Sequence, residues 1–520
     1  MIYEYNKFIE IIEKYDPRDL LNLIILIQSS YCKNDIKKDE YEGIKNLFAK
    51  IISFSSSFGK EHINYYDAKL CNSILNIMLS FLTKKYNNDR DDLNKLVCEG
   101  KLSQKQMMYE IGCPKTYARI FVETIKAKLI PFENILVNKF QLRLDDLVAS
   151  LEKMLKYLLK AFSIDDIFAY RIMDITDFFN KHFLDSLLSA NEKIDNIENV
   201  NAFSKSVCMP IVKIDNRFYL LSVEVFIDNF YLSIHRFIVN NLTKEEKDNL
   251  FALKGENFNN ICADLFYNKF CFLNAYKNFN YSRGEIDLIV EDSDALFIIE
   301  CKSRNYTDKV SSKSNAYIKA NESNLDFASS QLNRFLSEFE SKGTISLHKN
   351  NTSLKLIRTK YNYIIPIVLN IANLAEVNVD YSNRDKSMLF FSYDDLQIMA
   401  DIIEDKKYLF IDFCNQFLEN AKKETFVDDC IDMFAFYCQC KNLSMLFNEN
   451  TNVIIYQLGN DYFQKYFSYA TDKNPIFEFD NDIASFNHHC SNFKEMIENY
   501  HKVYWKELSD LKQKNSPLSY

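Results

Sequence analysis

The chain is poor in the residues that make tight turns. Its 520 residues include 8 glycines and 7 prolines, whereas average usage would give about 60 of the two together. This scarcity excludes collagen-like and low-complexity chains, and it argues against an all-β protein built on many short turns. Since 47% of the residues are hydrophobic and 26% are charged, we expect a globular, predominantly helical protein of roughly three domains.

Long apolar runs and an export signal are missing as well. The apolar runs, such as Leu23 to Ile27, are far shorter than the run of about 18 residues that indicates a membrane-spanning helix. The segment MIYEYNKFIEIIEKYD (1–16) has acids where a secretory signal needs a basic start and an apolar run. We therefore expect a soluble, cytoplasmic protein with no membrane partner.

The thirteen cysteines do not form a recognisable framework. Their number is odd and no pair has the CxxC spacing, so neither a disulfide scaffold nor a zinc site is predicted. We expect reduced, buried thiols instead.

The charge of the chain argues against electrostatic binding over the whole surface but indicates one local basic segment. The net charge of −9 argues against attraction of nucleic acid or anionic membrane to the whole surface. The segment from Glu300 to Lys360, however, contains eleven lysines and arginines and only six acids. The residues predicted to contact a phosphate backbone there are Arg304, Lys309, Lys313 and Lys319. A second basic run, 342–360, is compatible either with this role or with a solvated loop.

Periodicity divides the chain into three regions. Residues 1–200 are predicted to form a helical accessory or recognition domain, with the clearest helical spacing over 144–162. Within this region, 101–129 is compatible with a helix-turn-helix or with two packed helices that have no DNA role. Residues 201–400 mix strands with helices, and 401–520 return to a helical pattern. We expect domain boundaries near 200 and 400.

The central region shows the clearest strand pattern. A strand–turn–strand is predicted around Asp215-Asn216, followed by a helix over about 223–241. A second helix is predicted to begin near Gly255, and two strands, 286–290 and 296–301, are separated by the polar turn EDSD. Both strands are apolar on both faces, which is typical of strands covered on both sides. A long helix over about 316–339, strands within 361–372 and 386–393, and a helix from about 394 are expected to follow.

Two carboxylates lie inside these apolar strands. Burying Asp287 or Glu300 is costly unless the carboxylate has a partner or a metal ion. Lys302 follows Glu300 by two residues, so a strand projects both side chains to the same face. Mg²⁺ prefers a few carboxylates together with water and phosphate oxygens, so two acids and a lysine at adjacent strand ends predict a Mg²⁺ (or Mn²⁺) site that acts on phosphate esters. Glu256, on the preceding helix, can supply a further acid.

These residues resemble a known family. A helix bearing Glu256, a GEID strand bearing Asp287 and an IIECK strand bearing Glu300 and Lys302 resemble the PD-(D/E)XK nuclease superfamily, closest to its restriction-endonuclease-like and Holliday-resolvase-like branch. The resemblance covers about 250–340, and more loosely 208–400; Ile286 replaces the proline of the family name. It implies an α/β restriction-endonuclease-like core, a mixed sheet flanked by helices, between large all-helical N- and C-terminal regions.

The resemblance also implies a role for each site residue. Asp287, Glu300 and the backbone carbonyl of Cys301 would hold the metal ion, Lys302 would act on the attacking water, and Glu256 would be an accessory acid. Glu285 would join the outer shell of the metal or simply end the strand. Gln331 matches a glutamine often seen in related nucleases, although a solvent-facing or capping glutamine would fit this position equally well.

The implied function is Mg²⁺-dependent endonucleolytic cleavage, most readily of DNA, and by analogy a prokaryotic defence role. Three alternatives remain open at this stage. The acids and lysine could form a purely structural ion network, the fold could be a non-catalytic scaffold that binds nucleic acid or protein, or the substrate could be RNA. The helical regions are the expected sites of self-association or of a protein partner.

Overall fold

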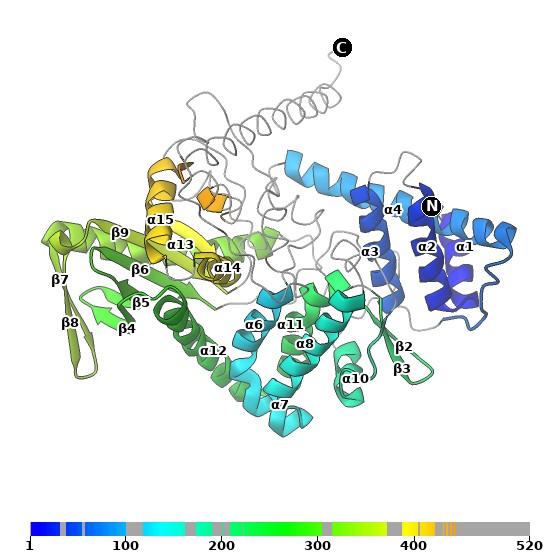
Figure 1. Ribbon diagram of the computed structural model, residues 1–520, viewed down its shortest axis with the longest axis horizontal. Helices are drawn as coiled ribbons and strands as arrows, with labels where there is room; N and C mark the ends of the chain where they lie inside the picture. Colours follow the sequence, from blue (N-terminus) through cyan, green and yellow to red (C-terminus); the bar gives the residue numbers. More distant parts are fainter. Residues whose placement is uncertain are drawn as a thin grey trace, which may run out of the picture.

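The computed structural model is mostly helical and contains two β-sheets (Figure 1). It describes residues 2–31, 38–54, 58–99, 118–161, 173–189, 200, 209–221, 223–303, 315–371, 387–403, 406–421, 430, 433–434, 437–438 and 441–443. The helices of the first half are α1 (Ile2–Lys14), α2 (Pro17–Tyr31), α3 (Lys38–Phe54), α4 (Ala68–Cys98), α6 (Ala118–Leu129), η1 (Ile130–Phe132), α7 (Glu133–Phe140), α8 (Leu144–Ala161), α10 (Lys181–Ser189) and α11 (Val223–Asn240). The later helices are α12 (Lys244–Asp264), η3 (Leu265–Lys269), α13 (Asn315–Lys342), η4 (Arg358–Lys360), α14 (Tyr393–Ile403) and α15 (Lys407–Ala421).

A small antiparallel sheet lies among the N-terminal helices. Its strands, in the order β1–β3–β2, are β1 (Met173–Asp174), β3 (Arg217–Leu220) and β2 (Ile211–Ile214). The expected turn is confirmed, since Asp215 and Asn216 both have positive φ, as a two-residue type I′ hairpin requires. The expectation of an all-helical N-terminal region is wrong at β1. This two-residue strand is too short to have a period of its own and exists only because β3 pairs with it.

The small sheet is covered by helices on both faces. Val212 belongs to a core formed by α1 to α4, whereas Ile211 and Phe218 belong to a second core with α6, α8, α10 and α11. This second core contains residues from both sides of position 200. The proposed domain limits stay a prediction. Of the expected helix-turn-helix, 101–117 lie outside the described residues, and α6 alone is described.

The large sheet has seven strands in the order β10–β9–β6–β5–β4–β7–β8. Their bounds are β4 (Asn274–Tyr281), β5 (Gly284–Glu291), β6 (Ala295–Lys302), β7 (Thr344–Lys349), β8 (Thr352–Ile357), β9 (Tyr363–Asn370) and β10 (Leu389–Ser392). Strand β9 is parallel to both of its neighbours, β6 and β10, and the remaining pairs are antiparallel. The expected mixed sheet is confirmed.

Helices cover both faces of this sheet, as the strand pattern predicted. On one face, Phe297 of β6 packs in a core with α12, α14 and α15, where its ring stacks on Phe410 at a centroid distance of 5.7 Å. On the other face, Ile298 packs in a core with Leu332 and Phe335 of α13. Adjacent residues of β6 thus enter different cores, which is the period-two alternation of a strand.

Helix α12 begins earlier than the sequence predicted. It starts at Lys244 and not near Gly255, because Thr243 and Glu246 form a capping box. The Thr243 hydroxyl accepts a hydrogen bond from the Glu246 N–H at 3.3 Å, and the Glu246 carboxylate accepts one from the Thr243 N–H at 2.7 Å. This reciprocal pair satisfies two amide groups that a helix start would otherwise leave without partners. Gly255 lies inside the helix.

Most of the basic run 342–360 is a hairpin, β7 and β8, between the end of α13 and η4, and not a solvated loop. Strands β7 and β8 alternate inward-facing Ile345 and Leu347 with exposed polar residues, a signal that the lysines obscured. The charges of this segment are largely paired. Lys342 contacts Glu338 at 2.7 Å, Arg358 contacts Glu340 at 2.6 Å, and Lys360 pairs with Glu291.

Within the described residues, no helix combines the length and the hydropathy that crossing a membrane requires.

Removing the capping hydroxyl of α12 should destabilise the protein. We expect Thr243→Ala to lower the free energy of unfolding by about 0.5–2 kcal/mol, since one N-terminal amide loses its acceptor. Urea unfolding followed by circular dichroism measures this effect. Thr243→Ser keeps the hydroxyl and serves as the control; equal stability of the alanine variant and wild type would contradict the capping role.

Candidate functional site

The predicted acids meet where the ladder between β5 and β6 ends. The ladder between β5 and β6 ends at Leu288 and Ile299, so Asp287 and Glu300 occupy the next opposite positions and project from the same face. On its other side, β5 pairs with β4 at Lys277 and at Phe279 but not between them, where Asn278 has a left-handed φ of 56°. Asp287 therefore stands at an irregularity of the sheet.

Asp287 substitutes for the missing strand pairing. Its Oδ2 accepts a hydrogen bond from the Cys301 N–H at 2.8 Å. The N–H and C=O of one strand residue point to the same side, and the neighbouring Lys302 carbonyl points away toward β9, where it accepts from Ile371 N at 3.0 Å. The Cys301 carbonyl is thus directed toward the Asp287 side, as the predicted ligand set requires.

Lys302 joins the two acids to α13. Its ammonium contacts Glu300 Oε2 at 3.0 Å and Asp287 Oδ2 at 3.9 Å, and it donates to Gln331 Oε1 at 3.3 Å. Three segments of the chain thus converge on one ammonium group. Gln331 lies in the cluster and does not face solvent alone, because α13 covers this face of β6.

Glu300 is the most deeply buried of these groups. Its side chain is 1% exposed, and its Oε1 has no hydrogen-bond partner among the described residues. Burial, together with repulsion from Asp287, raises the pKa of Glu300 to about 8 even though Lys302 lies at 3.0 Å. One lysine therefore does not neutralise the pair of carboxylates.

Glu256 and Glu285 lie outside this contact network. Both are exposed, and no hydrogen bond or ion pair of the described residues joins them to Asp287, Glu300 or Lys302. A Cβ at the adjacent Gly255 would lie 3.8 Å from Ser303 Oγ, so this turn of α12 runs beside the end of β6. The two-residue spacing of Glu285 and Asp287 does not place them on one face, because the alternation of β5 is broken at this point: Ile286 and Ile289 enter one core, and Leu288 enters the other.

Two neighbours of Lys302 were missed by sequence reasoning. Asn370 pairs with Lys302 across the parallel strands β6 and β9 and is buried. A polar residue ending the apolar run YIIPIVLN was the signal for it. Phe327 on α13 is 60% exposed, and its ring centroid lies 5.8 Å from Lys302 Nζ; a single phenylalanine in a helix gave no signal.

The predicted phosphate-contacting residues are largely beyond what the structure describes. Arg304, Lys309 and Lys313 lie outside the described residues. Lys319 is on α13, near its start, and only its backbone is described.

The candidate metal site offers only two carboxylates and one backbone carbonyl as protein ligands. In the described part of the chain, no group of three or more His, Cys, Asp and Glu side chains is arranged to hold a metal ion. Two carboxylates and a carbonyl nevertheless suit Mg²⁺, which keeps several waters and uses substrate phosphate oxygens. The unpartnered Glu300 Oε1 and the incomplete neutralisation of the acids fit a divalent cation at Asp287, Glu300 and the Cys301 carbonyl.

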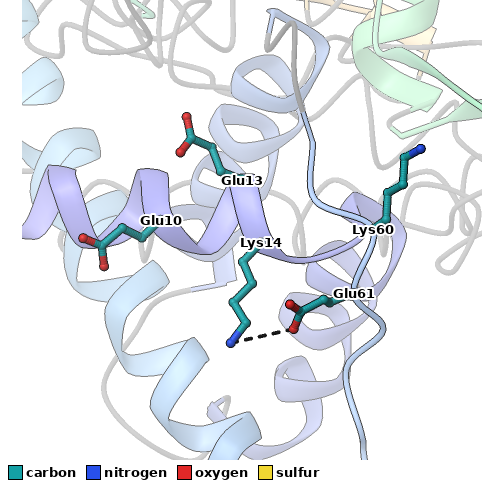
Figure 2. Close-up of a pocket in the computed structure, with 5 residues that line it drawn as sticks. All are labelled: Glu10, Glu13, Lys14, Lys60 and Glu61. Carbon is teal, nitrogen blue, oxygen red and sulfur yellow. Dashed lines mark ion pairs between the residues drawn. The ribbon is translucent and has the colours of Figure 1, made fainter.

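A surface depression elsewhere is lined only by charged, exposed side chains (Figure 2). They are Glu10, Glu13, Lys14, Lys60 and Glu61, and Lys14 pairs with Glu61 at 3.7 Å. None of the predicted site residues lines it. Its open, charged lining differs from the mostly apolar lining of small-molecule sites.

Comparison of the chain with protein-family models, with curated proteins and with solved structures finds no match.

The raised pKa of Glu300 predicts a pH-dependent stability of the metal-free protein. The carboxyl titrates near 4.5 when unfolded and near 8 when folded, so between these values the folded state holds a proton that the unfolded state has lost. The free energy of unfolding should therefore fall as the pH rises from about 4.5 to about 8, and level off above. Urea unfolding in EDTA from pH 5 to pH 9 measures this slope.

Glu300→Gln, which is neutral at every pH, should flatten the decline. Glu285→Gln removes an exposed carboxylate from the preceding strand and should keep the wild-type slope. The same slope in Glu300→Gln as in wild type would contradict the assignment.

Proposed function

We propose that the protein is a Mg²⁺-dependent nuclease that hydrolyses phosphodiester bonds, with Asp287, Glu300 and Lys302 as its central residues. The observation that carries the proposal is that all three side chains meet at the irregular end of β5 and β6, with Lys302 Nζ 3.0 Å from Glu300 and 3.9 Å from Asp287. The mixed sheet between α12 and α13 supports the resemblance to the PD-(D/E)XK nucleases.

The carboxylates of Asp287 and Glu300, with the Cys301 carbonyl, would hold the metal ion. A bound Mg²⁺ supplies Lewis-acid polarisation of the phosphoryl group and lowers the pKa of a coordinated water. Asp287 is oriented for this task by the hydrogen bond it accepts from Cys301. Glu300 is held by Lys302 on one oxygen and leaves the other oxygen free for a cation.

Lys302 would position the attacking water and stabilise the charge that develops on the phosphate. Its ammonium is anchored by Glu300 and Gln331, so it is preorganised, as transition-state stabilisation requires. With a cation on the acids, the ammonium can donate to a water or a phosphate oxygen. The contacts that hold the ammonium group thus also set the direction in which it can donate a hydrogen bond.

We propose DNA as the substrate, by family analogy and not by any base-reading element. The basic segment 304–319 would hold the phosphate backbone, because the charges of the 342–360 hairpin are largely occupied by Glu338, Glu340 and Glu291. RNA is the second substrate to test, and a defence role in the cytoplasm follows from the same analogy.

A structural ion network is the competing proposal. The chain contains such a pair on the same strand, since Lys407 contacts the buried Asp292, one residue beyond β5, at 3.0 Å. That pair has one acid and one lysine. Near the middle of β5, two acids share one lysine, so Glu300 keeps a proton up to about pH 8 in the metal-free protein. A divalent cation can take the place of that proton, which favours a cation site over a purely structural network.

Cleavage should depend on a divalent metal ion. Purified protein incubated with duplex DNA, single-stranded DNA and RNA should cut at least one substrate in Mg²⁺ or Mn²⁺ and none in EDTA, because Asp287 and Glu300 act through the cation. The Asp287→Asn variant, purified by the same procedure, controls for contaminating nucleases. Cleavage that persists in EDTA and is absent from the Asp287→Asn sample would remove the proposed mechanism.

Lys302→Ala should separate catalysis from structure. We expect cleavage to fall by about 100-fold or more, with substrate binding within a few-fold of wild type and a melting temperature close to that of wild type in Mg²⁺. Lys407→Ala removes the matched lysine near the opposite end of β5 and should lose stability but keep its cleavage rate. A Lys302→Ala variant that melts early, by the roughly 3–5 kcal/mol of a broken buried pair, and still cuts would favour the structural network.

A further inference from the structure

Lys254 on α12 is a buried lysine without an acid. Its side chain is 5% exposed, and among the described residues no ion pair or hydrogen bond satisfies its ammonium group. Buried ammonium groups are normally paired, because desolvating an unpaired charge costs several kcal/mol. Burial and the nearby Lys128 lower its pKa to about 7. Its Nζ keeps a slight contact with solvent, and no acid of the described residues neutralises it.

A second lysine lies beside it. Asn257 donates a hydrogen bond to the Ala127 carbonyl at 3.1 Å, which fixes α12 against the end of α6. Lys128 follows Ala127, and Lys254 lies one helical turn before Asn257, so both lysines reach the same junction. Figure 1 shows this junction where α12 leaves the large sheet and meets the N-terminal helices.

Aromatic rings and a histidine line the junction. Lys254 Nζ lies 5.9 Å from the ring centroid of Phe251, which stacks on His235 at 6.4 Å. His235 also packs on Tyr231, and Lys128 Nζ lies 6.0 Å from the Tyr231 centroid. The Nε2 of His235 is buried and has no hydrogen-bond partner in the described part of the chain, and burial lowers the pKa of this histidine to about 3.

The acids of two neighbouring helices are paired with other lysines. Asp394 of α14 contacts Lys128 at 3.4 Å, while Glu123 of α6 is paired with Lys269 at 2.8 Å. Lys254 and His235 are thus left with unmet polar atoms on neighbouring helices. An oxyanion is the group that accepts hydrogen bonds from both and also offsets the charge of two lysines.

We propose that Lys254, Lys128 and His235 form a binding site for the phosphoryl group of a small ligand, separate from the Asp287–Glu300–Lys302 cluster. A phosphate monoester has a charge of about −1.5 to −2 near pH 7 and three acceptor oxygens, which matches two ammonium groups and one imidazole N–H. A carboxylate has one charge and matches less well. Phe251, which is partly exposed, is the edge from which the rest of such a ligand would extend.

Binding of inorganic phosphate tests the site directly. At constant ionic strength and pH 7.5, phosphate added in place of chloride should raise the melting temperature of the full chain, and calorimetric titration should give a saturable, single-site isotherm. Lys254→Met should weaken phosphate binding at least 10-fold. In phosphate-free buffer, this variant should be as stable as wild type or more stable, because it no longer buries an unpaired charge.

Lys153→Met is the matched control. Lys153 also lies over an aromatic ring, 5.7 Å from the Phe178 centroid, but it is exposed, so its loss should leave phosphate affinity unchanged. Lys128→Met, which removes the second cation, should also weaken binding and provides the answer if Lys254→Met does not fold. No phosphate-induced shift in wild type, or equal affinity in wild type and both site variants, would overturn the proposal.

A nucleoside triphosphate that binds more tightly than phosphate, with the same dependence on Lys254, would identify a nucleotide as the source of the phosphoryl group. Equal affinity for both would assign the site to free phosphate. Because the Asp287→Asn variant keeps this junction intact, it should retain phosphate binding even if it shows no nuclease activity, so the two proposals fail separately.

Discussion

The burial of one carboxylate, that of Glu300, sets the constraint on the candidate site. Strand β6 is covered by helices on both faces, so a carboxylate within it is cut off from water and needs a positive partner. Lys302 is the nearest group that can supply the charge, because two residues along a strand return to the same face. Asp287 then adds a second acid that the lysine cannot also balance, so Glu300 keeps its proton up to about pH 8 unless another cation replaces it.

The irregular pairing of β5 creates this imbalance. A continuous ladder would give the Cys301 amide a backbone partner and would place Asp287 between regular strands. Instead the left-handed Asn278 interrupts one side, and the ladder to β6 stops before Asp287. The side chain of Asp287 therefore takes the amide of Cys301. Irregular backbone at functional sites is common because it directs polar groups that a regular sheet would bury in its ladders.

Helix α12 connects the two proposed sites. Its capping box starts the helix, Lys254 lies at the junction with α6 and α11, and the next residue, Gly255, runs beside Ser303 at the end of β6. Phe258 then anchors the helix in the core of the large sheet. A single rigid element thus passes a buried cationic junction and a buried anionic one, and each site has the charge that the chemistry proposed for it requires.

The sequence by itself determined the central strands and one face of the site. The strands that contain Asp287 and Glu300 follow from two short apolar runs, and the placing of Lys302 beside Glu300 follows from the two-residue period of a strand. Both signals depend on near neighbours alone. Only the tertiary structure decided that Gln331 reaches Lys302, that Asn370 lies beside it, and that Glu291 pairs with Lys360. These contacts join residues far apart in the chain. The pKa of Glu300 depends on burial by other elements, and the sequence around Glu300 contains no pattern that shows this burial.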